Sequence, residues 1–323
     1  MIRSDKFGKI DKILRKVNGN NIPFGGKQII VFGDLFQLPP IAKPQELKYL
    51  SDTFGGIHFF NSNSYRQNNF KFIELSVNHR QEGDLRFFEI LNRMREGVNT
   101  EDDIRELNKR NSFNQNELRR VITLFPTKAL AEEKNKNELN KIESKEYSYQ
   151  AKIIFNITNN QTPNLESIFP ISSTLKLKLG ALVMMVANDV DKRWVNGTLG
   201  IVSYISESMI KVKIDGYEYE VHKKEFTSQE AIYKNGEIHY QDVLQVTQYP
   251  LVLAYAITIH KSQGMTYQKV ACDISNCFSA GQAYVALSRC SSLDGLYLLE
   301  KLSNNSTIQV DPNVRDFYLN LIN

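Results

Sequence analysis

The chain has 323 residues, of which 41 % are hydrophobic and 24 % are charged, and its formal net charge is +4. This balance predicts a soluble globular protein with room for about two domains. No apolar run approaches the ~20 residues that a membrane span requires, and Met1 is followed by polar residues rather than an apolar leader. We therefore expect no membrane partner and a cytoplasmic location, or a nuclear or mitochondrial one in a eukaryote.

Three cysteines, Cys272, Cys277 and Cys290, lie late in the chain. Their odd number argues against a disulfide framework, so reduced thiols in a reducing compartment are expected. No histidine stands at a spacing that would complete a zinc site with Cys272 and Cys277, and the sequence predicts no metal site. The mild positive charge permits a polyanionic partner but does not require one.

The first predicted elements are a helix and a strand. Residues 1–20 have the spacing of an amphipathic helix, which Asn18-Gly19-Asn20 ends. The apolar run at 27–32 predicts a buried strand, because strands that are apolar on both faces are typical of a parallel α/β sheet. The strand ends in the loop Gly33-Asp34-Leu35-Phe36-Gln37-Leu38-Pro39-Pro40, where two prolines prevent its continuation.

The alternation of strands and helices continues along the chain. A second strand is predicted over 70–75, and it leads to Asn78-His79-Arg80-Gln81. A helix is expected over 84–97, and a further buried strand over 121–125 precedes a polar helix that extends to about residue 142. This pattern indicates a second α/β unit that begins near residue 112.

From about residue 174 the periodicity changes to that of short strands. Their close spacing, with turn signals at Asn196-Gly197 and Asp215-Gly216, predicts a small antiparallel barrel or meander. After about residue 248 the α/β pattern resumes, so the β-rich segment is predicted to be an insert. The short strands are expected over 181–186, 200–205, 209–214 and 217–221, and the later α/β runs over 251–256, 270–272 and 296–299.

Two loops that follow predicted strands carry side chains suited to phosphate chemistry. Ligands of open α/β sheets bind beyond the carboxyl ends of strands. Gln37 can donate and accept hydrogen bonds, so it could hold a water or a phosphate oxygen, or it could merely fill a turn. Arg80 is of the residue type that best neutralises a phosphoryl transition state, although a lone arginine in such a loop commonly serves a surface ion pair.

Two later segments are also candidates. The run at 258–266, TIHKSQGMT, gathers small donors, one cation and a glycine between a predicted strand and a helix, which suits a nucleic-acid backbone. The alternative is a capped helix start with Ser262 or Thr266 as the N-cap. In the run at 282–290, QAYVALSRC, the apolar residues predict a core-facing helix, and Arg289 at its end could simply offset the helix dipole.

In this order and at these distances, the segments resemble the helicase motifs of the Pif1/RecD-like branch of superfamily one. GDLFQLPP at 33–40 resembles the third motif, NHRQ at 78–81 the fourth, HKSQGMT at 260–266 the fifth, and VALSR at 285–289 the sixth. Pro126-Thr127-Lys128 and the run WVNGTLG at 194–200 also match, so the resemblance covers nearly the whole chain. It implies an α/β fold with an incomplete first RecA-like domain at 1–111, a second RecA-like domain at 112–175 and 249–323, and an inserted small β-barrel at 176–248.

The resemblance also implies a role for individual residues. Gln37 would sense the γ-phosphate, and Arg80 and Arg289 would be two arginine fingers that stabilise charge on the leaving phosphate. Closure of the cleft on ATP would move a DNA strand 5′ to 3′. The other nucleotide-binding positions would be Gly33, Asp34 and Gly264, and the single-strand track would be lined by His260, Lys261, Ser262, Gln263 and Thr266, with Thr127 and Lys128 as weaker candidates.

The implied cofactors of the complete enzyme are ATP and Mg²⁺, and the implied partner is single-stranded DNA or a forked duplex in repair or recombination. However, the sequence has no P-loop of the form G-x-x-x-x-G-K-[ST], and the nearest run, Gly25-Gly26-Lys27-Gln28, lacks the first glycine and the hydroxyl. The Asp-Glu pair that holds Mg²⁺ in the family would stand immediately before Met1. We therefore expect an amino-terminally truncated chain that has no ATPase activity of its own. Poor solubility is also expected, since residues 29–32 would form an exposed apolar edge.

Two other interpretations stay open. The chain could be a non-enzymatic module that binds single-stranded nucleic acid, or one half of a split helicase whose amino-terminal half is a separate chain. The first predicts binding of an oligonucleotide without ATP, and the second predicts activity only when the two halves are mixed. A gene remnant without function would show neither property.

Overall fold

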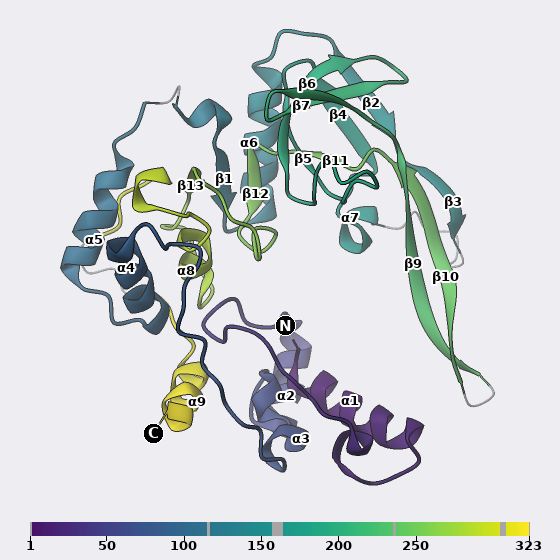
Figure 1. The fold of residues 1–323 in the computed structure, drawn as a ribbon, viewed down its shortest axis with the longest axis vertical. Helices are drawn as coiled ribbons and strands as arrows, with labels where there is room; N and C mark the ends of the chain where they lie inside the picture. Colours follow the sequence, from purple (N-terminus) through teal and green to yellow (C-terminus); the bar gives the residue numbers. More distant parts are fainter. Residues whose placement is uncertain (1, 115–116, 157–163, 235–236, 304–307, 323) are drawn as a thin grey trace. The chain divides into compact units, whose positions relative to one another are not determined.

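The computed structural model describes residues 2–114, 117–156, 164–234, 237–303 and 308–322. The chain divides into two compact units, Met1–Ser112 with Ser262–Asn323, and Phe113–Lys261 (Figure 1). In the described part of the chain, no helix is both long and apolar enough to cross a membrane.

The amino-terminal part of the first unit is helical and is held together by aromatic side chains. The predicted first helix is confirmed as α1 (Ser4–Val17). Only Phe7 of its apolar stripe is buried, and it lies 5.6 Å from Phe24 and from Phe59, measured between ring centroids. The other helical segments here are η1 (Pro23–Gly26), α2 (Pro44–Phe54), η2 (Phe59–Asn61) and α3 (Asn63–Arg66).

The remainder of the first unit combines four helices with a short parallel strand pair. α4 (Leu85–Glu96) confirms the predicted helix. Asp84 caps its start by accepting a hydrogen bond from the Phe87 amide, and Gly97 ends it in the left-handed conformation. β13 (Val270–Cys272) and β14 (Leu296–Leu298) pair in parallel. The other elements are α5 (Glu101–Asn108), η3 (Lys109–Asn111), α8 (Gln282–Leu287), η5 (Leu293–Gly295) and α9 (Pro312–Ile322).

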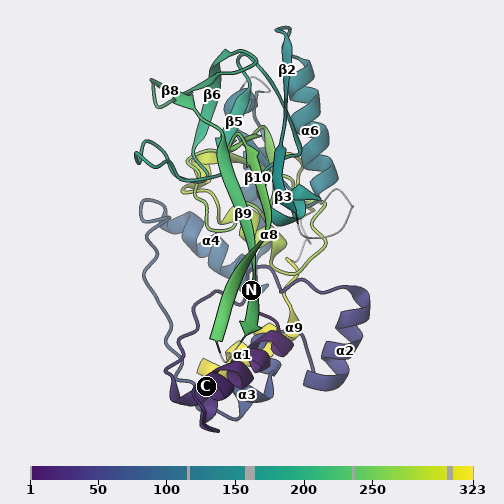
Figure 2. The same cartoon turned by 90° about the vertical axis from the view of Figure 1, so that its right-hand side faces the viewer.

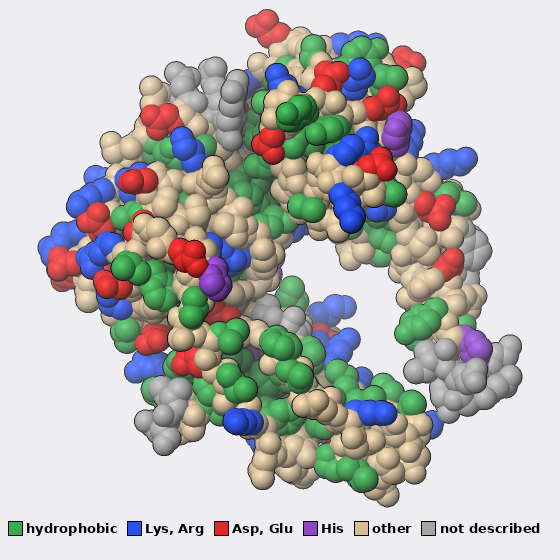
Figure 3. Space-filling model, in the orientation of Figure 1, with side chains coloured by type: hydrophobic (Ala, Val, Ile, Leu, Met, Phe, Trp, Pro, Cys, Tyr) green, Lys and Arg blue, Asp and Glu red, His purple; other side chains and the backbone are tan. Residues whose placement is uncertain are grey.

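The two strands predicted in the first hundred residues are not formed. Residues 27–32 and 70–75 have no strand assignment, and most of their apolar side chains are exposed, with Phe32 at 85 % and Leu75 at 86 %. Phe70 is an exception, because its ring stacks on that of Tyr65. A strand needs a neighbour to pair with its amide and carbonyl groups. The described residues of this unit supply no neighbour to either segment, so the prediction of buried strands was wrong for this chain. Figure 3 shows hydrophobic side chains on the surface of this unit.

The second unit begins with an α/β pair. β1 (Ile122–Phe125) is fully buried, as predicted, and pairs in parallel with β12 (Ala256–Thr258). The run predicted at 251–256 instead forms β11 (Leu251–Leu253), which belongs to an antiparallel sheet, and β12 begins only at Ala256. α6 (Lys128–Asn140) follows β1, and the Thr127 hydroxyl accepts a hydrogen bond from the Leu130 amide at its first turn. A short 3₁₀ segment, η4 (Glu117–Arg120), precedes β1.

Antiparallel strands make up the rest of the second unit and share one apolar core. The four predicted short strands are confirmed, and together with β11 they form a five-stranded sheet in the order β11-β5-β6-β7-β8. A closed barrel stays a prediction. The strands of this sheet are β5 (Leu182–Met185), β6 (Leu199–Ile205), β7 (Ile210–Ile214), β8 (Tyr217–Val221) and β11 (Leu251–Leu253), and β2 (Glu146–Gln150) pairs with β4 (Thr174–Lys178) beside them; α7 (Leu165–Ile168) is a single turn.

A long hairpin extends from this unit and was not predicted. β9 (Lys224–Lys234) and β10 (Glu237–Gln248) pair in antiparallel fashion, with β3 (Lys152–Asn156) on the other side of β10. Figures 1 and 2 show the two strands side by side as a twisted ribbon. The sequence of β9 is mostly polar and lacks the apolar alternation from which a strand is recognised. Ile238, Tyr240, Leu244 and Val246 of β10 do alternate, and this signal was missed.

Candidate functional site

Asp34 fixes the loop that follows residues 27–32. Its carboxylate accepts hydrogen bonds from the Phe36 amide at 3.1 Å and from Gln37 Nε2 at 3.4 Å. It also accepts from Arg95 Nε of α4 at 3.3 Å and from the Tyr284 hydroxyl of α8 at 3.2 Å. The loop is therefore tied to two helices through one carboxylate.

Gln37 lies between this loop and the segment at 258–266. Its Oε1 accepts a hydrogen bond from Gln263 Nε2 at 3.5 Å, the outer limit for such a contact. The side chain is half-buried, and its amide is engaged at both ends. The structure thus brings together Gln37 and Gln263, which are predicted site residues 226 positions apart.

Arg80 links the loop at 78–81 to the two later motifs. Its Nε donates to the Thr266 hydroxyl at 2.9 Å, and its Nη1 donates to the Ser288 carbonyl at 3.0 Å. The Asn78 side chain shapes the loop, since its Oδ1 accepts from the Arg80 amide at 2.8 Å and from the Gln81 amide at 3.1 Å. This local side-chain turn aims Arg80 at the other motifs.

Arg289 is buried, with 1 % of its surface exposed. Its Nε donates to the Val285 carbonyl at 2.9 Å, its Nη2 to the Ser288 hydroxyl at 2.8 Å and its Nη1 to the Met265 carbonyl at 3.3 Å. Burial and, second, the positive charge of Arg80 lower the pKa of Arg289 to about 10, so it stays protonated at neutral pH. The Val285 bond also satisfies a carbonyl at the end of α8, which fits the helix-dipole interpretation.

The two guanidinium groups share one electrostatic feature. Every described hydrogen bond that Arg80 and Arg289 donate from these groups goes to a hydroxyl or a carbonyl oxygen. Within the part of the chain that the structure describes, neither has a carboxylate within ion-pair distance. Two positive charges without such a partner are suited to binding an anion.

The segment at 258–266 continues into turns and not into a helix. Gly264 has φ +81°, and the Met265 amide donates to the Ser262 carbonyl at 3.0 Å. The interpretation of Ser262 or Thr266 as an N-cap was therefore wrong, because no helix follows them. In the first unit, Ser262 is buried, and Gln263 and Thr266 contact Gln37 and Arg80 as described above.

Four candidate residues lie in the second unit. Thr127 caps α6, and Lys128 pairs with Glu166 and with Glu132, which raises the pKa of Lys128. Burial lowers the pKa of His260, which favours its neutral form at pH 7. The Lys261 side chain is exposed, and its amide donates to the Thr258 hydroxyl at 3.3 Å. Among these four, Lys261 best fits a phosphate contact.

Three residues to which the sequence analysis gave no role hold the site together. Arg95 and Tyr284 bind Asp34, and Gly281 allows a close approach. A Cβ at Gly281 would lie 2.4 Å from the Phe36 carbonyl oxygen and 2.7 Å from that of Gln37, and its φ is +71°. A glycine directly before a helix was the available signal for Gly281, whereas nothing local marks Arg95 or Tyr284.

Gly33 is exposed and makes no close contact at its Cα, so the structure adds nothing to its predicted role. In the described residues, no group of three or more histidine, cysteine or acidic side chains could hold a metal ion. The three cysteines are not in disulfides, and burial raises the pKa of Cys272 and Cys290.

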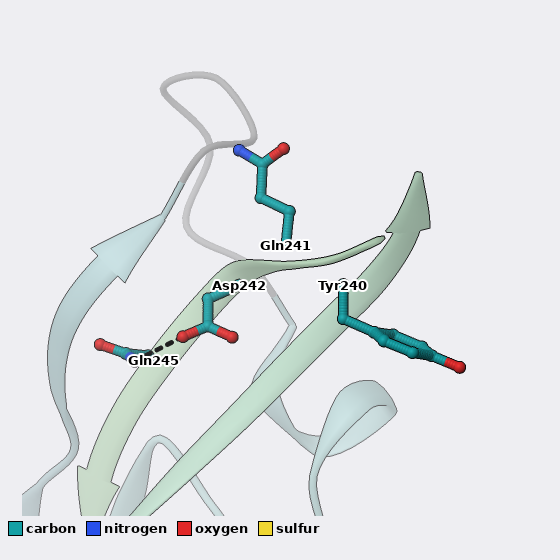
Figure 4. A pocket seen from close by; sticks show the side chains of 4 residues that line it. All are labelled: Tyr240, Gln241, Asp242 and Gln245. Atoms are coloured by element: carbon teal, nitrogen blue, oxygen red, sulfur yellow. Dashed lines mark hydrogen bonds between the residues drawn. The ribbon is translucent and has the colours of Figure 1, made fainter. Parts of the chain in front are cut away.

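A pocket of about 530 Å³ lies on the β9–β10 hairpin and contains none of the predicted site residues. It is lined by Tyr240, Gln241, Asp242 and Gln245, next to a register shift in the ladder (Figure 4). Gln245 Nε2 donates to Asp242 at 3.0 Å. The pocket is open to solvent and offers one carboxylate that is already hydrogen-bonded, so it does not point to a ligand.

Comparison with known sequences identifies the relatives of this chain. Residues 1–105 match the family model for PIF1-like helicases. The chain is 36 % identical over 309 residues to the ATP-dependent DNA helicase Pif1 of Bdellovibrio bacteriovorus, covering 95 % of this chain and 65 % of that protein. It is 33 % identical over 330 residues to the human ATP-dependent DNA helicase PIF1, covering 99 % of this chain and 48 % of that protein. The chain therefore spans about half to two-thirds of the length of these relatives.

Solved structures give the same result. Bacteroides Pif1 in complex with ADP-AlF4 is similar to this chain with a TM-score of 0.80 and 35 % identity, over 99 % of this chain and 73 % of that one. Bacteroides Pif1 bound to ssDNA is similar with a TM-score of 0.74, 35 % identity and the same coverage. Identity at this level over nearly the whole chain extends across both units and all four motifs. The chain belongs to the family of PIF1-like helicases.

Proposed function

We propose that these 323 residues form the part of an ATP-dependent DNA helicase that senses the γ-phosphate and holds single-stranded DNA. One observation carries the proposal: Arg80 donates to Thr266 and Ser288, Arg289 also donates to Ser288, and neither arginine has a carboxylate partner among the described residues. Residues predicted to contact ATP and residues predicted to contact DNA are therefore in direct contact. Such contacts are what coupling of hydrolysis to movement requires.

ATP would be the ligand of Gln37, Arg80 and Arg289. An arginine's planar fork neutralises charge that develops on a transferred phosphoryl group, and such residues contribute about 10³–10⁵ in turnover in related enzymes. A P-loop and an Asp-Glu pair would supply the phosphate cradle and the Mg²⁺ ligands, and the 323 residues contain neither sequence. We infer that these residues do not hydrolyse ATP when they are alone.

Single-stranded DNA would be the second ligand. Exposed Lys261, together with Gln263 and Thr266, offers a cation and neutral donors of the kind that bind phosphates without sequence preference. The ssDNA-bound Bacteroides relative supports this choice of ligand. Movement in the 5′ to 3′ direction, unwinding of forked duplexes and a role in repair or recombination are further parts of the proposal.

Reconstitution of ATP hydrolysis tests the proposal. The 323-residue chain is expected to show only background hydrolysis with single-stranded DNA, and adding a polypeptide that carries the family's P-loop and Asp-Glu pair is expected to restore turnover. Arg289→Lys in the mixture keeps the charge but loses the fork, and should reduce turnover by about 100-fold or more. Turnover by the chain alone, or an unchanged rate in the Arg289→Lys mixture, would count against the proposal.

A non-enzymatic single-strand binder is the second candidate. It is favoured by exposed Lys261 and the neutral donors Gln263 and Thr266, which need no nucleotide to bind a phosphate backbone. It predicts oligonucleotide binding by the chain and no turnover after mixing, so the same experiment separates the two functions.

A further inference from the structure

Arg95, in the last turn of α4, contacts the Gln37 loop in two ways. Its guanidinium carbon lies 4.7 Å from the centroid of the Phe36 ring, a cation–π contact, and its Nε donates to Asp34. The side chain is mostly buried, and burial is the largest single influence on its pKa, which it lowers. Asp34, Tyr284 and Tyr318 together outweigh burial, so the pKa of Arg95 is raised. Arg95 is therefore a charged anchor on the loop that carries Gln37.

Asp34 connects Arg95 to Gln37 through hydrogen bonds. The Phe36 amide donates to the Asp34 carboxylate, and the Gln37 amide donates to the Asp34 carbonyl at 3.2 Å. The Gln37 side chain also donates to the carboxylate. The backbone and the side chain of Gln37 both depend on where Asp34 lies, and Arg95 is one of two distant residues that hold it there.

The carboxyl-terminal helix α9 contacts Arg95 and the Gln37 loop through Tyr318. Tyr318 lies edge-on against Phe36, with ring centroids 5.2 Å apart, and the Arg95 guanidinium carbon is 5.5 Å from the centroid of the Tyr318 ring. The Tyr318 hydroxyl donates to Glu74 at 2.7 Å, and Glu74 is 3.9 Å from Arg95 Nη1. Arg95 is thus enclosed by two aromatic rings and two carboxylates.

α9 is itself docked firmly on the same unit. The Phe317 ring stacks on Phe60 at 4.0 Å with an interplanar angle of 5°, and Val314 is buried beside it. His58 Nε2 and an Asp311 carboxylate oxygen are 2.8 Å apart at the start of the helix. Movement of α9 would therefore displace Tyr318 and change its contacts with Arg95 and Phe36.

We propose that Arg95 is a positioning residue for Gln37 and that α9, through Tyr318, keeps Arg95 in place. The carboxyl-terminal helix then belongs to the nucleotide-sensing apparatus although it carries none of the recognised motifs. A lysine would not replace Arg95, because it lacks the planar group that stacks between the rings while donating to Asp34. This inference rests on the proposed role of Gln37.

Hydrogen exchange at residues 34–38 of the 323-residue chain tests the inference without nucleotide. The Phe36 and Gln37 amides report on Asp34 because both are bonded to it. Arg95→Lys and Tyr318→Ala are expected to speed exchange of these two amides about tenfold, the effect of losing one cation–π contact and one weak ion pair. Tyr318→Phe keeps the ring and should restore exchange to within about twofold of the parent chain.

Arg86→Lys is the matched control, because Arg86 lies on the same helix, is exposed, and pairs only with Glu89 among the described residues. It should leave exchange at 34–38 unchanged. Exchange in Arg95→Lys that equals that of Arg86→Lys would overturn the inference. A variant that had unfolded would instead exchange rapidly throughout α5 as well. In that case the comparison of exchange at residues 34–38 between Tyr318→Phe and Tyr318→Ala decides whether the Tyr318 ring holds the loop.

A kinetic measurement separates positioning from packing. In the mixture with the P-loop polypeptide, Arg95→Lys is expected to lower kcat about tenfold at unchanged KM for ATP, since Gln37 is proposed to act on the γ-phosphate during turnover. A raised KM with unchanged kcat would contradict a positioning role. If the parent mixture shows no turnover, the proposed function fails, and hydrogen exchange still decides whether Arg95 and Tyr318 hold the loop.

Discussion

Arg289 carries a positive charge into a buried position and is surrounded there by neutral oxygens. Its three described hydrogen bonds use three of the five N–H donors of the guanidinium group, and Arg80 nearby adds a like charge that helps lower its pKa. Such a pair is unfavourable until an anion arrives, because desolvated charge needs compensation. The arrangement of these two residues therefore supports the proposed binding of an anionic ligand.

Gly281 should tolerate no larger side chain without a loss of stability. Gly281→Ala would place a methyl group 2.4 Å from the Phe36 carbonyl in a left-handed conformation, so we expect a loss of about 2–4 kcal/mol in the free energy of unfolding. Urea denaturation measures it. Gly19→Ala is the control, since Gly19 has φ +62° but no atom within 4 Å of the new methyl group, and it should cost about 1 kcal/mol. Equal losses in the two variants would show that the close approach is absent.

The sequence predicted the chemically active residues better than it predicted their supports. Gln37, Arg80 and Arg289 were recognised from residue type and from their order along the chain. Arg95 and Tyr284 were not, because they contact Asp34 from 61 and 250 positions away, and no local pattern marks such a pair. The assigned roles stay predictions, whereas the contacts among Gln37, Arg80, Gln263 and Thr266 are structural facts.

At the scale of elements, α4 and α5 are joined by an ion pair that should give the fold a measurable pH dependence. Arg93 donates two hydrogen bonds to Asp103, at 2.8 and 2.7 Å, and Asp103 also takes part in the capping box of Thr100. The hydrogen bond from Arg93 lowers the pKa of Asp103 to about 2. The stabilisation is therefore present above the usual carboxyl pKa and is lost as the pH falls through about 2.

Asp103→Asn tests this ion pair. We expect it to lower the free energy of unfolding by about 2 kcal/mol at neutral pH and by much less near pH 2. The free energy of unfolding of the variant should therefore depend less on pH in the acid range. Urea titrations between pH 2 and 7 measure it. Asp102→Asn is the neighbouring control, because its pair with Arg105 is exposed on both sides. A loss in Asp103→Asn that is the same at every pH would contradict the assignment.

The exposed apolar side chains at 27–32 and 70–75 should promote aggregation and bind apolar dyes. Replacing Phe32 and Leu75 by serine is expected to reduce binding of an apolar dye and aggregation, while the free energy of unfolding changes by less than about 0.5 kcal/mol. Phe87→Ser is the opposite case, because Phe87 is fully buried in α4, and it should cost about 3–5 kcal/mol. A large loss of stability in the serine double variant would show that the two segments are packed.

These segments also show why some elements could not be predicted. An apolar run at 27–32 has the composition of a buried strand, but strand formation depends on a neighbour that composition cannot reveal. The converse holds for β9, which pairs with β10 although its own sequence is mostly polar. The helices α1, α4 and α6 were predictable because their spacing and caps are local.

At the scale of the whole molecule, the division between the two units falls between Lys261 and Ser262. This point lies inside the segment predicted to contact DNA, so residues of one motif belong to different units. The predicted domain boundaries at 111, 175 and 248 stay predictions. The family, in contrast, is established over nearly the whole chain by identity to relatives that include the Bacteroides enzyme.

Anisotropy of a fluorescent oligothymidine, measured with the 323-residue chain without ATP across a range of salt concentrations, tests whether the segment at 258–266 holds a DNA strand. We expect micromolar or tighter affinity that weakens with salt, and for Lys261→Ala a weaker affinity with a salt slope shallower by about 0.7. Lys269→Ala, which removes another exposed charge outside the motifs, should bind like the parent chain. Absence of binding, or equal losses in the two lysine variants, would contradict the claim that the segment at 258–266 holds the strand.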